Sequence, residues 1–459
     1  MHANLSVLKE MKNFVKVWNQ LKPLTQNLAL FAVGNIVLIN TLLIAGLLMF
    51  LFATIWQEVA LYRTWEDVGI FHTVRKFFYF DQGPDSWGPM RAALKLHQNG
   101  VPIYDIFFKK GVKFQYPPSS LLISMVLRRS IYLNLLSWLS VVVSIFFSFK
   151  IFEWTFKNNQ IHSASHYSRK DLRIITVTLI ALGLTFYPVI KAYSLGQIQT
   201  VLNALFAVTL WCWITGKQQF AGICLGMMCL IKPQYGLILI WGILRRHWKF
   251  VVPFILTFAA GMALSIGIFG FTNHLDYLKV LSFLSRHGEA LYANQSMNGL
   301  LHRLLFNGNN LVWESKKFPP FNPWVYFGTL MTSLTLLVTA LMPNKRKEQA
   351  AFIDFSLIAL TATIASPIAW EHHYGILLPI YAVLLPYLLE NPIFGKLTLP
   401  YLVISYGLCS NFLKFTNVLA FVPVLNILQS YLFFGSLMVL VCLHWLRRRN
   451  STPKLGVEF

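Results

Sequence analysis

The sequence of residues 28–56 reads LALFAVGNIVLINTLLIAGLLMFLFATIW and contains no Asp, Glu, Lys or Arg. It is longer than the roughly 20 apolar residues that an α-helix needs to cross the hydrocarbon core of a bilayer. The polar lead before it, with Lys9, Lys12, Lys16 and Lys22, is too long for a cleaved signal peptide. The sequence therefore predicts a membrane-spanning helix that remains in the protein.

The composition of the chain is that of a membrane protein. Hydrophobic residues make up 56% of the 459 residues and charged residues 12%, whereas a soluble domain is about one quarter charged. Further apolar segments follow the first at 131–149, 174–190, 197–215, 219–231, 233–244, 250–271, 323–342, 351–369, 372–389, 397–413 and 418–443. We therefore expect an all-α polytopic membrane protein with about twelve transmembrane helices.

Basic residues in the short loops predict the orientation, because cytoplasmic loops are enriched in Lys and Arg. Most basic clusters fall on one side of an alternating path: the N-terminal lysines, Arg169-Lys170, Arg245-Arg246, Lys345-Arg346-Lys347 and Arg447-Arg448-Arg449. Arg128-Arg129 does not fit this path, and we interpret it as part of an interfacial helix.

The domain organisation follows from this orientation. We expect a cytoplasmic N-terminal segment (1–27), a transmembrane domain (28–445) and a cytoplasmic tail (446–459) in a multi-pass protein of the inner (plasma) membrane. Two long loops, 57–121 and 272–322, are then extracytoplasmic, and we expect interfacial helices in the first of them.

The net charge and the cysteines do not indicate other classes of protein. The formal net charge is +22, but the basic residues are scattered over loop ends, which the positive-inside rule and anionic lipids explain without a nucleic-acid partner. The five cysteines lie in apolar segments without CxxC spacing, as expected of packing residues. A nucleotide-sugar enzyme is not indicated either, since the sequence has no Asp-x-Asp pair and no Gly-rich phosphate loop.

The first outer loop contains the candidate base, Asp85. Trp87 and Met90 recur at helical spacing in residues 85–100, and Asp85 and Ser86 stand where a helix cap belongs. One interpretation is therefore that Asp85 only caps this helix. The other is that its carboxylate accepts a proton from a hydroxyl whose oxygen attacks a sugar carbon, since an inverting sugar transfer needs one such base.

Lys232 is the candidate ligand of a phosphate. A charge within an apolar segment costs on the order of 2.5 to 3.5 kcal/mol, which indicates a function. The segments on either side of it are short, so Ile231-Lys232-Pro233 predicts a broken helix or a re-entrant hairpin. Snorkelling of Lys232 to the membrane surface is an equally open interpretation.

His372 and His373 are further candidates for the phosphate, because an imidazole can hold a leaving phosphate or share its proton. Adjacent side chains on a helix diverge by about 100°, so the two histidines cannot point identically into one pocket. One imidazole is enough for either role. An ordinary interfacial histidine pair remains an alternative. A zinc site would require a spacing such as His-Glu-x-x-His, which is absent, and we expect neither metal nor cofactor.

Other polar residues are candidate substrate contacts. Arg303 offers directional hydrogen bonds to a phosphate, and amides offer them to sugar hydroxyls, although helix-end capping explains the amides equally well. Tyr116, followed by Pro117-Pro118, belongs to a segment that we expect to shape the loop where it enters the membrane. The candidate substrate-binding residues are Tyr116, Gln197, Asn294, Gln295 and Trp370.

In five stretches and their order, the chain resembles the bacterial polyprenyl-phosphate-mannose-dependent α-mannosyltransferases of the glycosyltransferase-C superfamily. The similarity extends over roughly residues 85–385 on a matching hydropathy profile. The stretches are Asp85 to Asp105 with Gly100 and Tyr104, running on to Phe114-Gln115-Tyr116-Pro117-Pro118; Leu195-Gly196-Gln197-Ile198-Gln199; Ala221-Gly222 through Ile231-Lys232-Pro233; Asn294-Gln295-Ser296 with Arg303; and Ser366-Pro367-Ile368-Ala369-Trp370 with His372-His373.

The resemblance implies a glycosyltransferase-C-like bundle, a lipid-phosphate sugar donor, and an aspartate of the first outer loop as the base on the non-cytoplasmic face. That aspartate maps to Asp85 by its spacing to Gly100 and Tyr104. The chain departs from the family in having Ser86 where an aromatic residue usually follows the aspartate. Asp81, Glu66 and Asp67 therefore remain rivals.

These observations lead to one principal hypothesis and two alternatives. The chain is expected to transfer a hexose, in particular mannose, from a polyprenyl-phosphate donor to a lipid or glycan acceptor on the extracytoplasmic face, with inversion. One alternative is a transporter or flippase of an anionic or lipid-linked substrate, which the intramembrane lysine beside a broken helix would suit. The other is an enzyme of the same superfamily that adds aminoarabinose or joins preassembled glycans.

Overall fold

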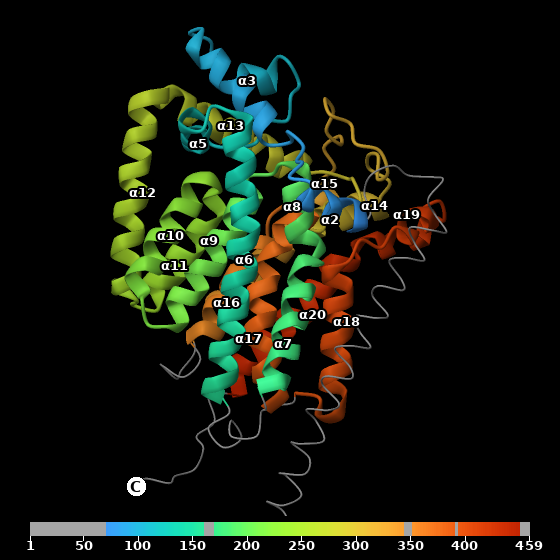
Figure 1. Ribbon diagram of the computed structural model, residues 1–459. Helices are drawn as coiled ribbons and strands as arrows, with labels where there is room; N and C mark the ends of the chain where they lie inside the picture. The colour runs from blue at the N-terminus through green and yellow to red at the C-terminus, as the bar shows by residue number, and fades with distance from the viewer. Residues whose placement is uncertain (1–69, 160–168, 344–350, 391–392, 450–459) are drawn as a thin grey trace, which may run out of the picture.

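The computed structural model describes residues 70–159, 169–343, 351–390 and 393–449 (Figure 1). The first expected span, the N-terminal lysines, Glu66, Asp67, Lys345-Arg346-Lys347 and the last residues of the tail lie outside this part of the chain. Within it the structure is helical, and the only β-type pairing is an isolated bridge between Asn294 and Trp370.

One group of helices lies at the end of the bundle where the two long loops meet. Figure 1 shows this end at the top. Its elements are α2 (Ile70–Phe78), α3 (Trp87–Gln98), α4 (Asp105–Phe108), η1 (Pro118–Ser120), α5 (Leu121–Val126), α13 (Phe271–His287) and α14 (Met297–Leu304). The predicted helix over residues 85–100 corresponds to α3.

The other helices form the bundle and its remaining connections. They are α6 (Ser130–Asn159), α7 (Arg169–Leu184), α8 (Tyr187–Leu195), α9 (Gln199–Ile214), α10 (Gln218–Ile231), η3 (Pro233–Tyr235), α11 (Gly236–Leu244), α12 (Trp248–Phe269), α15 (Pro323–Leu341), α16 (Ala351–Ile364), η4 (Glu371–Ile376), α17 (Leu377–Glu390), η5 (Gly395–Leu397), α18 (Thr398–Ser410), α19 (Phe415–Leu419), η6 (Pro423–Ser430) and α20 (Tyr431–Arg449).

Several helices are long and apolar enough to cross a membrane. In the described residues there are four, Ser130–Asn158, Trp248–Phe269, Pro323–Leu341 and Pro423–Arg448, and a fifth if the bent pair α7–α8 forms one span. The second and third are only 17% buried inside the protein, so most of their apolar surface faces outward, as expected of contact with lipid. The chain is therefore an all-α membrane protein.

The predicted interruption at Lys232 is present. Pro233 has no N–H group to donate to the turn before it, so the α-helix ends at Ile231 and Lys232 takes an extended conformation before η3. The hydroxyl of Ser119, in η1, donates to the carbonyl of Leu230 at 2.5 Å. This hydrogen bond satisfies a carbonyl at the interrupted end of α10.

A buried ion cluster joins the helices at the opposite end. The carboxylate of Asp354, at the start of α16, accepts hydrogen bonds from Arg245 at 2.8 Å, from Arg447 at 3.1 Å and from the indole N–H of Trp241 at 2.9 Å. Both arginines also donate to carbonyls in the last turns of α15 and at its C-cap. Arg245 and Arg447, from two of the basic clusters that the sequence predicts on one side of the membrane, thus meet at the start of α16. Trp370 follows the other end of this helix.

Candidate active site

The loop that contains Asp85 is held by its backbone against the junction of α8 and α9. Residues 83–86 run beside residues 194–196 through three hydrogen bonds: Gly83 N to Ser194 O (2.9 Å), Asp85 N to Leu195 O (3.0 Å) and Ser86 N to Gly196 O (3.1 Å). We call residues 83–86 the strap. These backbone hydrogen bonds to the bundle fix the position of the Asp85 Cα atom.

Two glycines allow this close approach. Gly196 ends α8 with φ +71°, a left-handed conformation that favours glycine, and a Cβ atom there would lie 1.7 Å from the carbonyl oxygen of Gly83. A Cβ at Gly83 would lie 2.8 Å from the carbonyl oxygen of Leu195. Any other residue at Gly196 must therefore push the strap away.

The carboxylate of Asp85 points back to the bundle and accepts a hydrogen bond from the side-chain amide of Gln197. Asp85 is not the cap of α3: the N-cap residue is Ser86, and no side chain caps this helix. Asp81, the rival within the described residues, and Asp85 are both exposed, and Asp81 lies within electrostatic reach of Tyr193. Asp85 thus has a specific partner that the capping interpretation did not predict.

Ser86 and Tyr116 hold the amide of Gln197 in one orientation. The carbonyl oxygen of Gln197 accepts hydrogen bonds from the Ser86 hydroxyl at 2.7 Å and from the Tyr116 hydroxyl at 2.9 Å. The Ser86 hydroxyl also accepts from the backbone N–H of Ile198 at 3.0 Å. With its oxygen occupied in this way, Gln197 must turn its NH₂ group toward Asp85. Ser86, where the chain departs from the family pattern, is therefore part of the support of the carboxylate.

The electrostatic surroundings of Asp85 include a lysine that sequence reasoning missed. Loss of hydration raises the pKa of Asp85, while the hydrogen bond from Gln197 and the positive charge of Lys191 act in the opposite direction. Lys191 lies in α8, is 9% exposed and also lies within electrostatic reach of Glu371. Lys191 falls between the predicted segments 174–190 and 197–215, as Lys232 falls between 219–231 and 233–244. The high cost of a charge in an apolar stretch, which singled out Lys232, would therefore have singled out Lys191 as well.

Lys232 is buried and bonded inside the protein, so it does not snorkel to the surface. Its ammonium group donates to the side-chain oxygen of Gln199 at 2.7 Å and lies 2.6 Å from Nε2 of His373. When Lys232 is protonated it can only donate, and Nε2 of His373 then accepts while Nδ1 carries the ring hydrogen. Gln199 in turn donates to Asn203 at 2.9 Å.

Several buried polar atoms around Lys232 have no hydrogen-bond partner within the part of the chain that the structure describes. They are Nδ1 of His373, Nε2 of His372 and Nδ2 of Asn203. An unsatisfied buried donor costs about 1 to 3 kcal/mol, which a ligand with acceptor oxygens would remove. Together with the charge of Lys232, this set of groups is suited to bind an anion.

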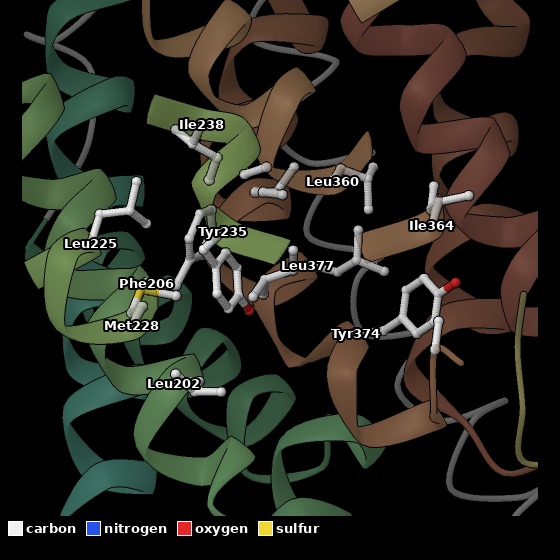
Figure 2. Packing of buried hydrophobic residues seen from close by; sticks show 14 of the residues in the cluster. Leu202, Phe206, Leu225, Met228, Tyr235, Ile238, Leu360, Ile364, Tyr374 and Leu377 are labelled. Carbon is white, nitrogen blue, oxygen red and sulfur yellow. The ribbon is translucent and has the colours of Figure 1, made fainter. Parts of the chain in front are cut away.

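The two groups of polar side chains are linked through the start of α9. Gln197 contacts Asp85 and Gln199 contacts Lys232, and the Cα atoms of residues two apart are separated by at most about 7 Å. The adjoining hydrophobic core, shown in Figure 2, includes Phe206 of α9, Tyr235 of η3 and Leu377 of α17. The group around Lys232, whose members Gln199 and His373 are also buried, therefore lies beside a water-poor interior, where electrostatic interactions are strong.

Three of the remaining candidates, Arg303, Asn294 and Gln295, hold the segment around α14 in place. Arg303 is 1% exposed and donates to the carbonyls of Leu291 and Asn294 at 3.0 Å each and to Ser430 at 2.6 Å. The side chain of Asn294 bonds to residues 367 and 369, and that of Gln295 to residues 429 and 433. The structure thus brings Asp85, Gln197 and Tyr116 together in one group and Lys232 and His373 in another, and it places Arg303, Asn294 and Gln295 in backbone contacts.

Comparison with known proteins adds an independent finding. A family model described as Glycosyltransferase family 87 matches residues 114–367, more than half of the 459 residues. This range contains Gln197 and Lys232, but it begins after Asp85 and ends before His372.

Two curated proteins are similar over shorter parts of the chain. One is an Alpha-(1->3)-arabinofuranosyltransferase of Corynebacterium glutamicum, 21% identical over 174 residues, which cover 38% of this chain and 40% of that protein. The other is a Polyprenol-phosphate-mannose-dependent alpha-(1-2)-phosphatidylinositol mannoside mannosyltransferase of Mycobacterium tuberculosis, 24% identical over 199 residues, which cover 43% of each chain. The chain thus spans less than half the length of either relative.

Proposed function

The chain belongs to glycosyltransferase family 87, and we propose that it transfers a hexose, mannose in particular, from a polyprenyl-phosphate donor to a lipid or glycan acceptor. One observation supports this function above the others. The carboxylate of Asp85 contacts Gln197, and the buried ammonium group of Lys232 contacts Gln199, two residues further along the chain. Family membership also supports the enzyme hypothesis over a transporter.

In the proposed reaction, the carboxylate of Asp85 accepts the proton of an acceptor hydroxyl while that oxygen attacks the anomeric carbon of the donor sugar. The bond between this carbon and the phosphate oxygen breaks, and both of its electrons leave with the polyprenyl phosphate. Lys232 and His373, with His372 beside them, bind the phosphate as its charge grows. Attack opposite the leaving phosphate with a single base inverts the configuration of the sugar.

Other residues act on this reaction by holding its parts. Gln197, Ser86 and Tyr116 orient the carboxylate of Asp85. Arg303 supports the second outer loop by its contacts with carbonyls, and in this proposal it is a positioning residue. We further propose about twelve spans, with residues 28–56 as the first and the loops 57–121 and 272–322 on the extracytoplasmic side.

The direct test is a transfer assay with the full-length protein in lipid vesicles. We expect labelled sugar to move from polyprenyl-phosphate mannose to an acceptor in a glycolipid extract. Polyprenyl-phosphate arabinofuranose is the second donor to try, because a relative named for arabinofuranosyl transfer is similar to the chain. Transfer from neither donor, or movement of intact donor across the bilayer without transfer, would contradict the proposal.

Replacing Gly196 by alanine is expected to lower transfer by more than about 100-fold, since a displacement of roughly 1 Å near the reacting groups can cost that much. The added Cβ would collide with Gly83 and move the strap with Asp85. Gly216→Ala is the matched control, because Gly216 has the same left-handed backbone, φ +77°, with open space around it. Equal losses of transfer in the two variants would show that only backbone strain matters.

A further inference from the structure

A second group of side chains lies outside the site described above, where the two outer loops meet. The ammonium group of Lys113 lies 4.1 Å from the ring centroid of Trp313 and 4.2 Å from that of Phe318. It also forms an ion pair with Glu289 at 2.5 Å, and the side chains of Lys113 and Glu289 are each 5% exposed. A lysine is thus enclosed between two aromatic rings and a carboxylate.

Trp313 is exposed although it is held in place. Lys113 lies over its ring, and 45% of the residue remains accessible. Trp370 meets Trp313 edge to face, with centroids 5.5 Å apart and planes at 71°. The two indoles therefore form a corner with an angle of 71° between their planes, which we call the indole corner.

The indole corner adjoins both halves of the proposed site. Trp370 is followed directly by Glu371 and His372. Lys113 is three residues before Tyr116, so their Cα atoms are at most about 11 Å apart, and the Tyr116 hydroxyl lies 2.8 Å from that of Ser86 beside Asp85. Figure 1 shows the golden loop after α14, which contains Trp313, at the same end of the bundle as α3.

The charges around the indole corner favour a neutral ligand. Lys113 is neutralised by Glu289, and Glu314 contributes a further negative charge nearby. A phosphate or another anionic group gains nothing from such surroundings. A buried ion pair adds little net stability, so orientation of Trp313 by Lys113 is a better reason for its presence than stability. The C–H face of a sugar ring is apolar enough to stack on an indole, while its hydroxyls remain in water.

We propose that Trp313 and Trp370 bind a pyranose ring of the acceptor glycan, and that Lys113 is the positioning residue that holds Trp313. This inference rests on the proposed function, and it specifies the acceptor as a saccharide that extends from the site across the outer surface. An interfacial anchor in the lipid headgroups would be the ordinary role of an exposed tryptophan.

The test compares Trp313→Ala with Trp324→Ala, a 77% exposed tryptophan at the start of α15. We expect Trp313→Ala to raise the KM for the acceptor about tenfold, as for a residue that dominates a contact, with the donor KM and kcat unchanged. Lys113→Met should raise the acceptor KM in the same way, and Lys113→Arg should restore it. Saturation-transfer NMR with α-linked mannobiose, without donor, should show contact in Trp324→Ala and none in Trp313→Ala.

The outcomes separate this inference from the proposed function. A normal acceptor KM and normal mannobiose contact in Trp313→Ala would overturn the indole corner and leave the transferase intact. Trp313-dependent mannobiose binding without sugar transfer from any polyprenyl phosphate would support the indole corner and reject the proposed reaction. Reduced association with lipid vesicles in Trp313→Ala, with acceptor binding unchanged, would identify Trp313 as a membrane anchor and overturn the inference.

Discussion

Transfer by Asp85→Asn is expected to fall by about 10²- to 10⁴-fold, the usual contribution of a general base. Asparagine keeps the size of the side chain but cannot accept the proton of the acceptor hydroxyl. Because the proposed phosphate site at Lys232 is unchanged in this variant, the affinity for the polyprenyl-phosphate donor should remain near that of the native protein. The measurement is single-turnover transfer of labelled sugar in vesicles, together with donor binding to the same preparation.

The pH dependence of transfer provides a second readout of Asp85. Only the ionised carboxylate can act as a base, so transfer decreases as the pH falls through the pKa of this group. Partial loss of hydration raises that pKa against the opposing effects of Gln197 and Lys191, and the midpoint of the decrease should therefore lie above about 4, the ordinary value for aspartate. The residual activity of Asp85→Asn should lack this decrease.

Asp81→Asn is the matched control, since Asp81 lies four residues earlier in the same loop and, like Asp85, is exposed. It should transfer sugar at nearly the native rate. If Asp81→Asn were inactive and Asp85→Asn active, the base would be Asp81, and the contact between Asp85 and Gln197 would be structural only.

Lys232→Met is expected to lower kcat by about 10²- to 10³-fold, as does removal of one group that stabilises charge in a transition state. Methionine fills much of the same volume, and losing a charge in this water-poor interior should not prevent folding. The charge that grows on the phosphate oxygens during bond breaking would then lose its nearest cation. Binding of the product, polyprenyl phosphate, should weaken as well.

The two variants together distinguish the two halves of the site. Product binding should be weak in Lys232→Met and normal in Asp85→Asn, because only the first variant loses a proposed phosphate ligand. Lys217→Met removes an exposed lysine at the other end of α10 and should leave both transfer and product binding unchanged. Strong product binding in Lys232→Met would show that the phosphate binds elsewhere, for which Lys191 is the next cation to examine.

Some parts of this site could be predicted from the sequence because their causes are local. A proline has no N–H group wherever it stands, so the interruption of the helix at Lys232 follows from Pro233 alone. An ionisable residue in an apolar stretch is costly in any fold, which singled out Lys232 and would also have singled out Lys191. The choice of Asp85 by motif spacing led to a carboxylate that the structure places beside Gln197.

Other parts could not be predicted, because they depend on which side chains meet across long separations. Gln197 is 112 residues from Asp85, and Lys113 is 176 residues from Glu289. Asn294 and Gln295 were candidates for sugar contacts because amides form directional hydrogen bonds, yet in the structure these bonds join one loop to another. The residue types predicted that these side chains form hydrogen bonds, but the sequence did not indicate their partners.

By itself the sequence determined that this chain is an all-α membrane protein, because uncharged stretches of this length are stable only where a helix satisfies its backbone in lipid. It also determined the interruption of the helix at Lys232, which Pro233 causes. The tertiary structure alone decided that Ser86 and Tyr116 orient Gln197 toward Asp85, and that the ammonium group of Lys113 lies over an exposed indole. Hydrogen bonds and ring contacts act over a few ångströms, and only the packing of distant segments brings such groups within that range.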